Sequence, residues 1–295
     1  MVSIDRRALG KSFGSASGRY DEAAVLQRTV RRELLERLEH FSTTPTVVID
    51  LGAGTAAATR DLKARYPTAT VVAADLSLGM LQHAQKASGW LDRLRTSKRI
   101  EAALVDAHRL PFRSGSVDLI FSSLMLQWCD LDEVFAEVRR VLSPQGWFVF
   151  STFGVGTLQE LRAAWATVDT NQRVHEFFDM HDIGSALTRA GLREPVLDVD
   201  RHSLTYSDPI SLMRGIKEIG AGNAARERPR GLTSPRVLQA VSDAYPRSRG
   251  QSDIVATWEI VYGAAFGAPT QLTESSHDAS EIIVPFPKPG ARHRK

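Results

Sequence analysis

The sequence contains a single cysteine, Cys129, among 295 residues, which excludes an internal disulfide and makes a cysteine-rich metal site implausible. It also lacks an apolar run long enough to span a membrane, and residues 1–14 have no apolar core of the kind that signal peptides contain. Hydrophobic residues (43%) and charged residues (24%) occur at levels ordinary for a globular protein. We therefore expect a cytoplasmic, monomeric protein that binds no metal.

The chain is organised around residues 46–58, TVVIDLGAGTAAA, an apolar and β-branched run that opens into a glycine turn. Such a run suits a central parallel strand that is buried on both faces. Two glycines allow positive φ, which brings backbone N–H groups and the N-terminus of the next helix toward a ligand. The turn alone is weak evidence, because dinucleotide enzymes use a similar one. Its candidate cofactor contacts are Asp50, Gly52, Ala53, Gly54 and Thr55.

Acidic residues also end the next two predicted strands. Asp75 follows the apolar residues 70–74, and Asp106 follows residues 100–105. Ligands of a doubly wound sheet lie across the carboxyl ends of its strands, so Asp50, Asp75 and Asp106 are expected to face one crevice. A carboxylate at position 75 can accept hydrogen bonds from ribose hydroxyls. The alternative is that each acid only caps the helix that follows it.

These acids, in the segments DLGAGT, AADLS and DAHRLPF, resemble the pattern of class I S-adenosylmethionine-dependent methyltransferases. The resemblance implies a Rossmann-like α/β fold with a doubly wound, mostly parallel, seven-stranded sheet, and S-adenosylmethionine as the cofactor. Leu76, Met80, Ala107 and Ser122 join the cofactor contacts on this basis. Ala56 stands where the family often has glycine. Because alanine is the best helix former, we expect cofactor binding to survive this change.

The remaining segments surround this core. Apolar positions recur at helical spacing before the first strand and predict an amphipathic helix that covers the crevice. The last apolar run predicts an antiparallel strand at or next to a sheet edge. The predicted parts are a flexible lead-in (1–19), the cover helix (20–41), the cofactor-binding core (42–155), a helical substrate- and partner-binding addition with one strand (156–250), the last strand (251–267) and a disordered tail (268–295).

Four residues outside the glycine turn are candidates for the acceptor side of the crevice. Tyr20 begins the cover helix and can reach into the crevice, or it is a core aromatic. Gln127 and Trp128 follow the fourth strand, although packing alone would explain the tryptophan. Arg162 lies on the first turns of a helix after a second glycine turn, where its planar guanidinium suits a carboxylate. The alternative for Arg162 is an ordinary surface salt bridge.

Basic residues are concentrated between positions 214 and 249, although the net charge of the chain is only +3. Such a cluster is either a solvated surface or a docking site for an acidic protein. Nucleic acid is not expected, because aromatic residues that stack on bases are few there. Arg214 and Lys217, three positions apart on one predicted helix, present a joint face. The other members are Arg226, Arg228, Arg230, Arg236, Arg247 and Arg249.

Several longer segments resemble one subfamily, the malonyl-acyl-carrier-protein O-methyltransferases of biotin synthesis. The resemblance runs from about residue 12 to about residue 266, and GTLQELRAAW and MHDIG are its most specific parts. It implies that Arg162 holds the free carboxylate of malonyl-acyl carrier protein, that Tyr20 closes over the donor methyl, and that the basic cluster docks the acidic carrier protein. The matching segments are Phe13, RYD (19–21), LQ (26–27), DLGAGT, LMLQWC (124–129), FSTFGVGTLQELRAAW (150–165), FFDMHDIGSAL (177–187), LTYSD (204–208) and residues 213–220.

The implied reaction agrees with the residues at hand. A carboxylate with a pKa of about 4 is already ionised at neutral pH, so no general base is required, and the crevice offers no obvious one. Catalysis would then rest on alignment of the reacting atoms. Two alternatives remain open. One is a methyltransferase acting on a small acid or a quinone ring, and the other is an assembly factor that binds the cofactor but works on a protein partner.

Overall fold

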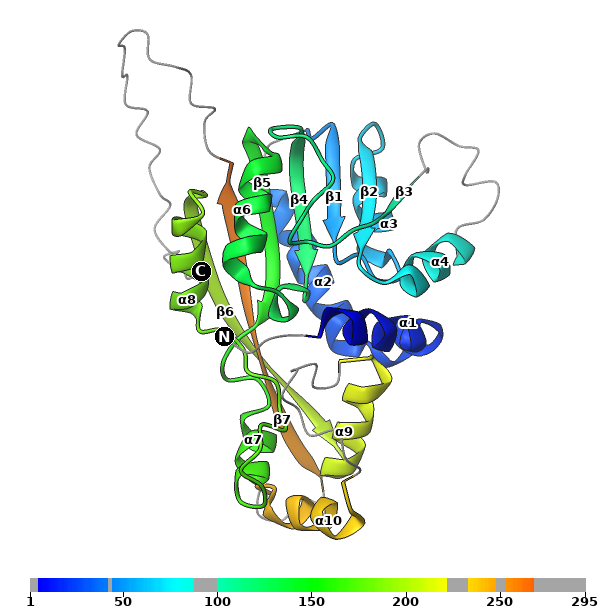
Figure 1. The fold of residues 1–295 in the computed structure, drawn as a ribbon, viewed down its shortest axis with the longest axis vertical. Coiled ribbons are helices and arrows are strands. Elements are labelled where there is room, and N and C mark those ends of the chain that lie inside the picture. Colours follow the sequence, from blue (N-terminus) through cyan, green and yellow to red (C-terminus); the bar gives the residue numbers. More distant parts are fainter. Residues whose placement is uncertain (1–4, 42–43, 88–99, 222–232, 248–252, 268–295) are drawn as a thin grey trace, which may run out of the picture.

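The computed structural model describes residues 5–41, 44–87, 100–221, 233–247 and 253–267. Within these residues, one sheet has the strand order β3-β2-β1-β4-β5-β7-β6 (Figure 1). β1 to β5 run parallel, whereas β7 pairs antiparallel with both β5 and the edge strand β6, which confirms the predicted doubly wound, mostly parallel α/β sheet. The strands are β1 Val47–Leu51, β2 Thr70–Asp75, β3 Glu101–Leu104, β4 Val117–Ser123, β5 Leu142–Phe153, β6 Arg193–Tyr206 and β7 Ile254–Phe266.

Helices cover both faces of the sheet. α2 and α3 pack on one face in a core that includes Val48 and Phe121, and α6 and α8 pack on the other around Phe135 and Phe148. Apolar strands buried on both faces are typical of parallel sheets, as residues 46–58 predicted. The helices are α1 Arg6–Ala23, α2 Val25–Arg37, η1 Leu38–His40, α3 Ala57–Arg65, α4 Leu78–Ala87, η3 Leu126–Trp128, α6 Leu131–Val141, α7 Gln159–Ala166, α8 Met180–Arg189, α9 Pro209–Glu218 and α10 Pro235–Ala244.

The long strands β6 and β7 extend past the parallel strands and carry a second lobe (Figure 1). Residues 254–259 of β7 pair with β6 alone. α7, α9 and α10 pack around this extension, where Leu212, Val241 and Trp258 are buried. These helices make up the addition predicted for residues 156–250, whereas α8 of the same stretch packs against α6 beside the sheet.

The flexible lead-in predicted for residues 1–19 is wrong from Arg6 onward. Residues 6–23 form α1, which lies below the carboxyl ends of the parallel strands (Figure 1). The predicted single cover helix over residues 20–41 is instead interrupted at Ala24 and continues as α2. Glycine disfavours helix in isolation, but here it allows close packing, since a Cβ on Gly79 of α4 would lie 2.9 Å from the Cα of Gly14.

One local expectation also needs correction. Ala56 is not an ordinary helical residue, because it precedes α3 in the left-handed conformation, with φ of 58°. Among the described residues, no helix combines the length and apolar character needed to cross a membrane. The predicted tail over 268–295 and the basic residues Arg226, Arg228, Arg230 and Arg249 lie outside the described residues.

Candidate functional site

A cavity of about 110 Å³ lies at the carboxyl edge of the sheet, between the strand ends and α1. The glycine turn, the ends of β2 and β4, and the segment after β3 form its walls, and α1 closes it. Ligands of doubly wound sheets bind at this edge, where neighbouring crossovers diverge. Its lining includes the predicted residues Tyr20, Gly52, Gly54, Asp75, Leu76, Met80, Asp106, Ala107 and Trp128, together with Arg6, Leu9, Gly10, Phe13, His108, Ser123 and Met125.

The glycine turn is fastened to β2 by hydrogen bonds. The N–H groups of Gly52 and Ala53 donate to the carbonyl of Ala74, at 2.8 and 3.1 Å, and that of Gly54 donates to Asp75 Oδ2 at 2.8 Å. Gly52 and Gly54 have φ of 80° and 54°, which glycine adopts without strain. A Cβ on Gly54 would meet no atom within 4 Å, so this residue leaves open space beside the cavity.

Asp75 has the position expected of a ribose ligand. Its second oxygen, Oδ1, accepts a hydrogen bond from the N–H of Ser77 at 2.7 Å. Burial raises the pKa of Asp75, and the N–H groups of Ser77 and Gly54 oppose that rise by stabilising the charged form. Each carboxylate oxygen has more than one lone pair, so both can still accept a hydrogen bond from a ligand hydroxyl.

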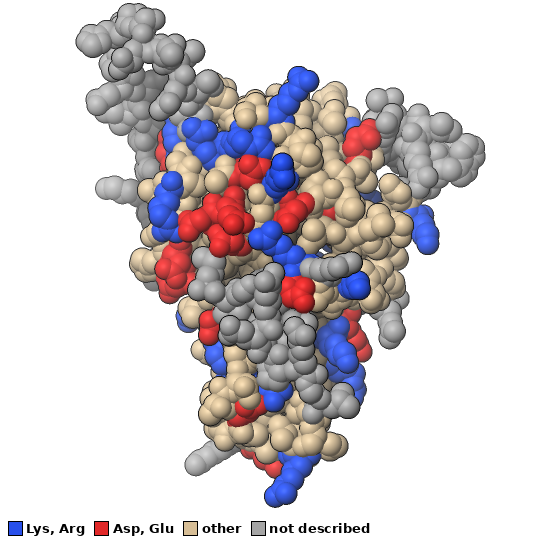
Figure 2. All heavy atoms as spheres, viewed as in Figure 1, with Lys and Arg blue, Asp and Glu red and all other residues tan. Residues whose placement is uncertain are grey.

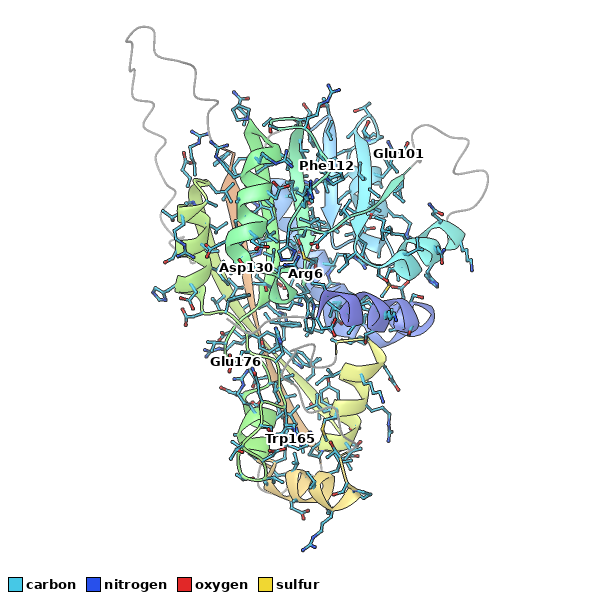
Figure 3. All side chains as sticks on the ribbon, viewed as in Figure 1. Arg6, Glu101, Phe112, Asp130, Trp165 and Glu176 are labelled. Atoms are coloured by element: carbon cyan, nitrogen blue, oxygen red, sulfur yellow. The ribbon has the colours of Figure 1, made fainter. Side chains whose placement is uncertain are left out.

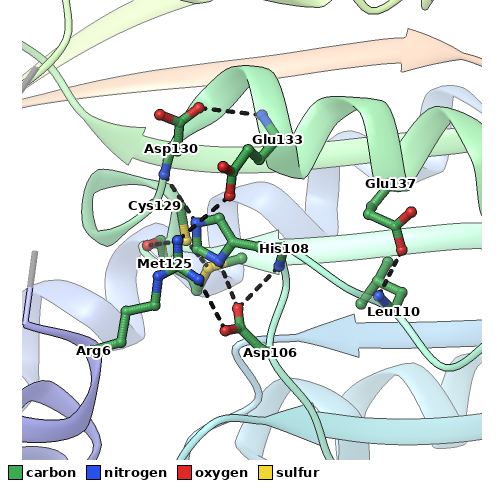
Figure 4. Close-up of polar contacts among 9 residues, drawn as sticks. All are labelled: Arg6, Asp106, His108, Leu110, Met125, Cys129, Asp130, Glu133 and Glu137. Carbon is green, nitrogen blue, oxygen red and sulfur yellow. Dashed lines mark hydrogen bonds and ion pairs between the residues drawn. The ribbon is translucent and has the colours of Figure 1, made fainter. Parts of the chain in front are cut away.

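Asp106 is held by His108 and by Arg6 of α1 (Figure 4). Arg6 Nη1 lies 3.1 Å from Asp106 Oδ2, and His108 Nδ1 lies 2.5 Å from Oδ1. The N–H of Asp130 donates to His108 Nε2 at 3.1 Å, so the proton of the neutral imidazole is on Nδ1. Although burial acts to raise it, the pKa of Asp106 is lowered by hydrogen bonds from His108 and the charge of Arg6. Neither Arg6 nor His108 was among the predicted site residues, although His108 stands within DAHRLPF.

α1 is tied to both sides of the cavity. The hydroxyl of Thr55 in the glycine turn donates to Asp21 Oδ1 at 2.7 Å, and the hydroxyl of Ser12 donates to the carbonyl of Gly220, after α9, at 3.2 Å. Tyr20 therefore lies in the cavity wall, where burial and the nearby Asp75 raise its phenol pKa, so the hydroxyl keeps its proton. Tyr20 was predicted to reach into the crevice from a cover helix, and it does line the cavity. The helix that covers the cavity is α1, however, and not a helix over residues 20–41.

Four predicted cofactor contacts do not line the cavity. Asp50 is buried on the α3 side of β1 and accepts a hydrogen bond from Thr59 Oγ1 at 2.6 Å; burial raises its pKa to about 7. It precedes the last residue of β1, and strand alternation turns it away from the crevice. Thus Asp75 and Asp106, not all three acids, meet there. Ala53 and Thr55 are buried, and Ser122 donates to the carbonyl of Leu51 at 2.9 Å, so its neighbour Ser123 lines the cavity instead.

Gln127 and Trp128 have different surroundings. Gln127 is buried, and its amide donates to the carbonyl of Leu124 at 2.6 Å and accepts from Thr152 Oγ1 at 3.2 Å. Both ends of the side chain are thus used to hold the turn after β4. Trp128 lines the first cavity, packs edge-on against Phe13 of α1 and also lines a second, smaller cavity toward the second lobe.

Arg162 braces the second glycine turn and lines neither of these cavities. Its Nη1 and Nη2 donate to the carbonyls of Val155 and Thr157, both at 3.1 Å, and its buried Nε has no hydrogen-bond partner among the described residues. Burial lowers its pKa, and the charge of Glu176, at the junction of the two lobes in Figure 3, opposes that effect.

The second cavity, of about 60 Å³, contains two polar residues that the sequence analysis missed, Arg173 and His175. Arg173 is neutralised by Asp169, with Nε 2.7 Å from Oδ2, and stacks on Trp165. His175 is buried against Trp128. Arg173 and His175 differ from ordinary surface residues only in being buried, which the sequence does not show directly. The one available sign was that His175 stands next to the apolar residues of RVHEFF.

The described members of the basic cluster between positions 214 and 249 are exposed. Arg214 and Lys217 lie on α9, Arg236 on α10 and Arg247 after it. Figure 2 shows Lys and Arg side chains over the part of this lobe where Figure 1 draws α9. The predicted joint face of Arg214 and Lys217 is therefore open to solvent, within reach of an incoming partner.

Comparison with known proteins agrees with this geometry. A family model described as a methyltransferase domain matches residues 49–150. A putative methyltransferase of Bacillus halodurans C-125 has a similar fold, with a TM-score of 0.52 at 16% identity over 81% of this chain and 100% of that chain.

Two curated relatives are much closer in sequence. The malonyl-[acyl-carrier protein] O-methyltransferase of Methylovorus sp. (strain MP688) is 45% identical over 264 residues, 89% of either chain. That of Halorhodospira halophila (strain DSM 244 / SL1) is 47% identical over 268 residues, 90% of this chain and 89% of the other. The chain belongs to the malonyl-[acyl-carrier protein] O-methyltransferase family, as the resemblance of its segments implied.

Proposed function

We propose that this protein transfers the methyl group of S-adenosylmethionine to the free carboxylate of malonyl-acyl carrier protein. The product is a malonyl methyl ester, which would serve as the primer for the pimeloyl chain of biotin. The observation that supports the proposal is the position of Trp128, which lines both the cavity between α1 and the strand ends and the smaller cavity toward the second lobe. A donor site in the first cavity and an acceptor site beside the second would meet at this side chain, and family membership points to the same acceptor.

The residues of the first cavity fit S-adenosylmethionine. Asp75 would accept hydrogen bonds from the ribose hydroxyls, Asp106 would accept one from the adenine amino group, and the open space at Gly54 would admit the ligand close to the backbone. Leu76, Met80 and Ala107 supply apolar walls. When bound, the cofactor supplies a methyl group on a positively charged sulfur. The protein then has to exclude water, orient the acceptor and keep its carboxylate ionised.

The cavity has no ready base among its described residues, which favours an acceptor that is already an anion. Both ring nitrogens of His108 are engaged, and burial raises the pKa of the Tyr20 phenol. Burial likewise raises the pKa of the Cys129 thiol to about 12. A carboxylate needs no deprotonation at neutral pH, whereas methylation of a quinone ring carbon would require removal of a proton. Carboxyl methylation is therefore the better match.

Arg162 is the residue that we assign to the malonyl carboxylate. Only two of its five N–H groups have partners, both backbone carbonyls, and no carboxylate lies within hydrogen-bond distance of it in the described part of the chain. Arg173, in contrast, is already paired with Asp169. A half-buried guanidinium with free donors is suited to an incoming carboxylate. To bind it, the Arg162 side chain would rotate away from the carbonyls of Val155 and Thr157 and toward the acceptor. Tyr20, in the wall formed by α1, would close over the donor methyl.

One comparison of acceptors tests this function. S-Adenosylmethionine with a labelled methyl group is incubated with malonyl-acyl carrier protein, malonyl-coenzyme A and succinyl-acyl carrier protein, and base-labile label is counted on each. We expect the highest kcat/KM for malonyl-acyl carrier protein. Transfer to none of the three, by a protein that binds the donor, would instead support a binding role such as that of an assembly factor.

The carrier protein is proposed to dock on α9. Its acidic surface would meet the exposed Arg214 and Lys217, which would raise the association rate more than the affinity. Charge reversal of both residues should therefore lower kcat/KM about tenfold with malonyl-acyl carrier protein at low salt, and less with malonyl-coenzyme A. Equal slowing with both acceptors would remove the docking role from this face.

A further inference from the structure

The small cavity between Trp128 and α9 contains one polar atom, His175 Nδ1, that no described residue satisfies. Its walls are mostly aromatic and aliphatic, formed by Trp128, Phe153, Phe177, Ile216 and Trp258. Within this surface lies His175, whose side chain packs on Trp128 with ring centroids 4.9 Å apart. The cavity is therefore mostly apolar, with two polar groups in its wall: the imidazole of His175 beside the proposed donor site, and the guanidinium of Arg173, which is paired with Asp169.

The hydrogen-bonding state of His175 follows from its neighbours. The residue is only 7% exposed, and its Nε2 lies 2.8 Å from the carbonyl oxygen of Gln127. A carbonyl only accepts hydrogen bonds, so Nε2 carries a proton. Burial lowers the pKa of His175, and the Gln127 contact and the charge of Glu176 only partly oppose this, so the ring is neutral. Nδ1 is then a bare acceptor, buried and without a partner among the described residues.

An unsatisfied buried acceptor is costly, and a ligand that donates an N–H or O–H group would remove that cost. The apolar walls exclude a strongly charged group, so the ligand should combine methylenes with a neutral donor. Trp128 lines the cavity together with Ile216 of α9 and Ile219, directly after that helix, and the residues Arg214 and Lys217 of α9 are exposed to solvent. It thus lies between the proposed methyl donor and the proposed docking face.

We propose that this cavity binds the thioester arm of the substrate, with His175 Nδ1 accepting a hydrogen bond from the amide N–H nearest the thioester. The arm that carries acyl groups on carrier proteins is a chain of methylenes and amides, which matches an apolar wall with one acceptor. This assignment rests on the proposed function and names the subsite that receives the arm. His175 acts as a substrate-binding residue and takes no part in the transfer of the methyl group.

The test replaces the amide by an ester within the substrate. Malonyl-acyl carrier protein is prepared with its natural arm and with an arm in which that amide nitrogen is replaced by oxygen, which keeps the shape but removes the donor. Wild-type enzyme should prefer the natural arm by about tenfold in kcat/KM, the effect of one buried hydrogen bond. His175→Phe keeps an aromatic ring on Trp128 but lacks the acceptor. This variant should therefore use the amide and ester arms with about equal kcat/KM.

Phe177→Leu is the matched control, because Phe177 lines the same cavity and contacts His175 edge-on without a polar atom. It should slow both substrates equally and keep the preference for the amide. Binding of S-adenosylmethionine, measured by titration, should be unchanged in both variants. A wild-type enzyme that uses the two arms equally well would overturn the assignment without any variant, as would a preference that persists in His175→Phe. Absence of methyl transfer to the natural substrate would instead mean that the proposed function itself fails.

Discussion

Two glycine turns, residues 52–54 after β1 and residues 154–156 after β5, are alike in sequence but have different surroundings. At the first turn, a Cβ on Gly54 would enter open space beside the cavity. At the second, a Cβ on Gly154 would lie 2.5 Å from Glu259 Oε1, and one on Gly156 would lie 2.7 Å from Oε2. Glu259 is buried and accepts a hydrogen bond from the N–H of Gly156 at 3.1 Å. In the first turn only Gly54 leaves space for a ligand, because a Cβ on Gly52 would overlap Met125 Cγ, whereas both glycines of the second turn pack on a protein side chain.

The comparison teaches that a glycine motif indicates close approach but not what approaches. Both turns follow strands at the same sheet edge, and both precede a helix. The second turn nevertheless contributes to the proposed site through Arg162, which is braced by two of its carbonyls. The two turns should therefore respond differently to substitution, one in ligand affinity and the other in stability and turnover.

The largest effect is expected from Arg162→Ala. Turnover of malonyl-acyl carrier protein should fall by more than about 100-fold, or roughly 3 kcal/mol in transition-state stabilisation, because the acceptor carboxylate loses its cation. Affinity for S-adenosylmethionine, measured by calorimetric titration, should stay near the wild-type value. Undiminished turnover would remove Arg162 from the site. Loss of turnover together with loss of the folded state would mean that the residue only braces its turn.

Asp75→Ala should weaken S-adenosylmethionine binding by about 1.5 to 3 kcal/mol, the value of hydrogen bonds to a charged group. The same titration gives the measurement. Asp50→Asn is the control, because Asp50 contacts Thr59 rather than the cavity and should leave affinity within about threefold of wild type, less than 1 kcal/mol. A titration unchanged by Asp75→Ala would refute the ribose assignment.

Gly154→Ala should lower the free energy of unfolding by about 2 kcal/mol, because the new methyl group overlaps a buried carboxylate. Urea denaturation measures this change. The contrasting variant is Gly54→Ala. The strain of an alanine at positive φ should lower its free energy of unfolding by about 1 to 2 kcal/mol, and the variant should also bind the cofactor more weakly. If Gly154→Ala instead reduced cofactor affinity at unchanged stability, the two turns would not differ as described.

The smallest effect is expected from Ala56→Gly. Relief of the left-handed conformation, with φ of 58°, favours glycine by about 1 kcal/mol, whereas loss of a buried methyl costs about 0.8 kcal/mol. The free energy of unfolding should thus change by less than about 0.5 kcal/mol, and cofactor affinity should not change. A shift above 1 kcal/mol in either direction in urea denaturation would show that one of the two terms dominates.

Much of the fold could be predicted from the sequence, because its signals are local. Apolar runs gave the parallel strands, and the last apolar run gave β7, the antiparallel strand next to the edge strand β6. α1 could not be predicted in this way. Its glycines look unfavourable to a helix until Gly14 meets Gly79 of α4. The prediction that Ala56 is helical was wrong for the same reason, since its backbone conformation is set by tertiary packing.

The candidate site was only partly predictable. Asp75 and Asp106 follow from the rule that ligands lie at the carboxyl ends of parallel strands. The rule does not say toward which face of the sheet a side chain points, and Asp50, one residue before the end of β1, points toward α3. Arg6 and His175 depend on contacts over long sequence separations. His175, for example, bonds to the carbonyl of Gln127, 48 positions earlier. Such contacts have no local pattern.

The central claim is that the methyl group ends on the malonyl carboxylate. Intact-protein mass spectrometry of malonyl-acyl carrier protein, after incubation with the enzyme and S-adenosylmethionine, tests it most directly. We predict a product heavier by the mass of one added methylene, which reverts to the starting mass when a carboxyl esterase hydrolyses the new ester. An unchanged mass with bound donor, or a methyl group that esterase cannot remove, would contradict the claim.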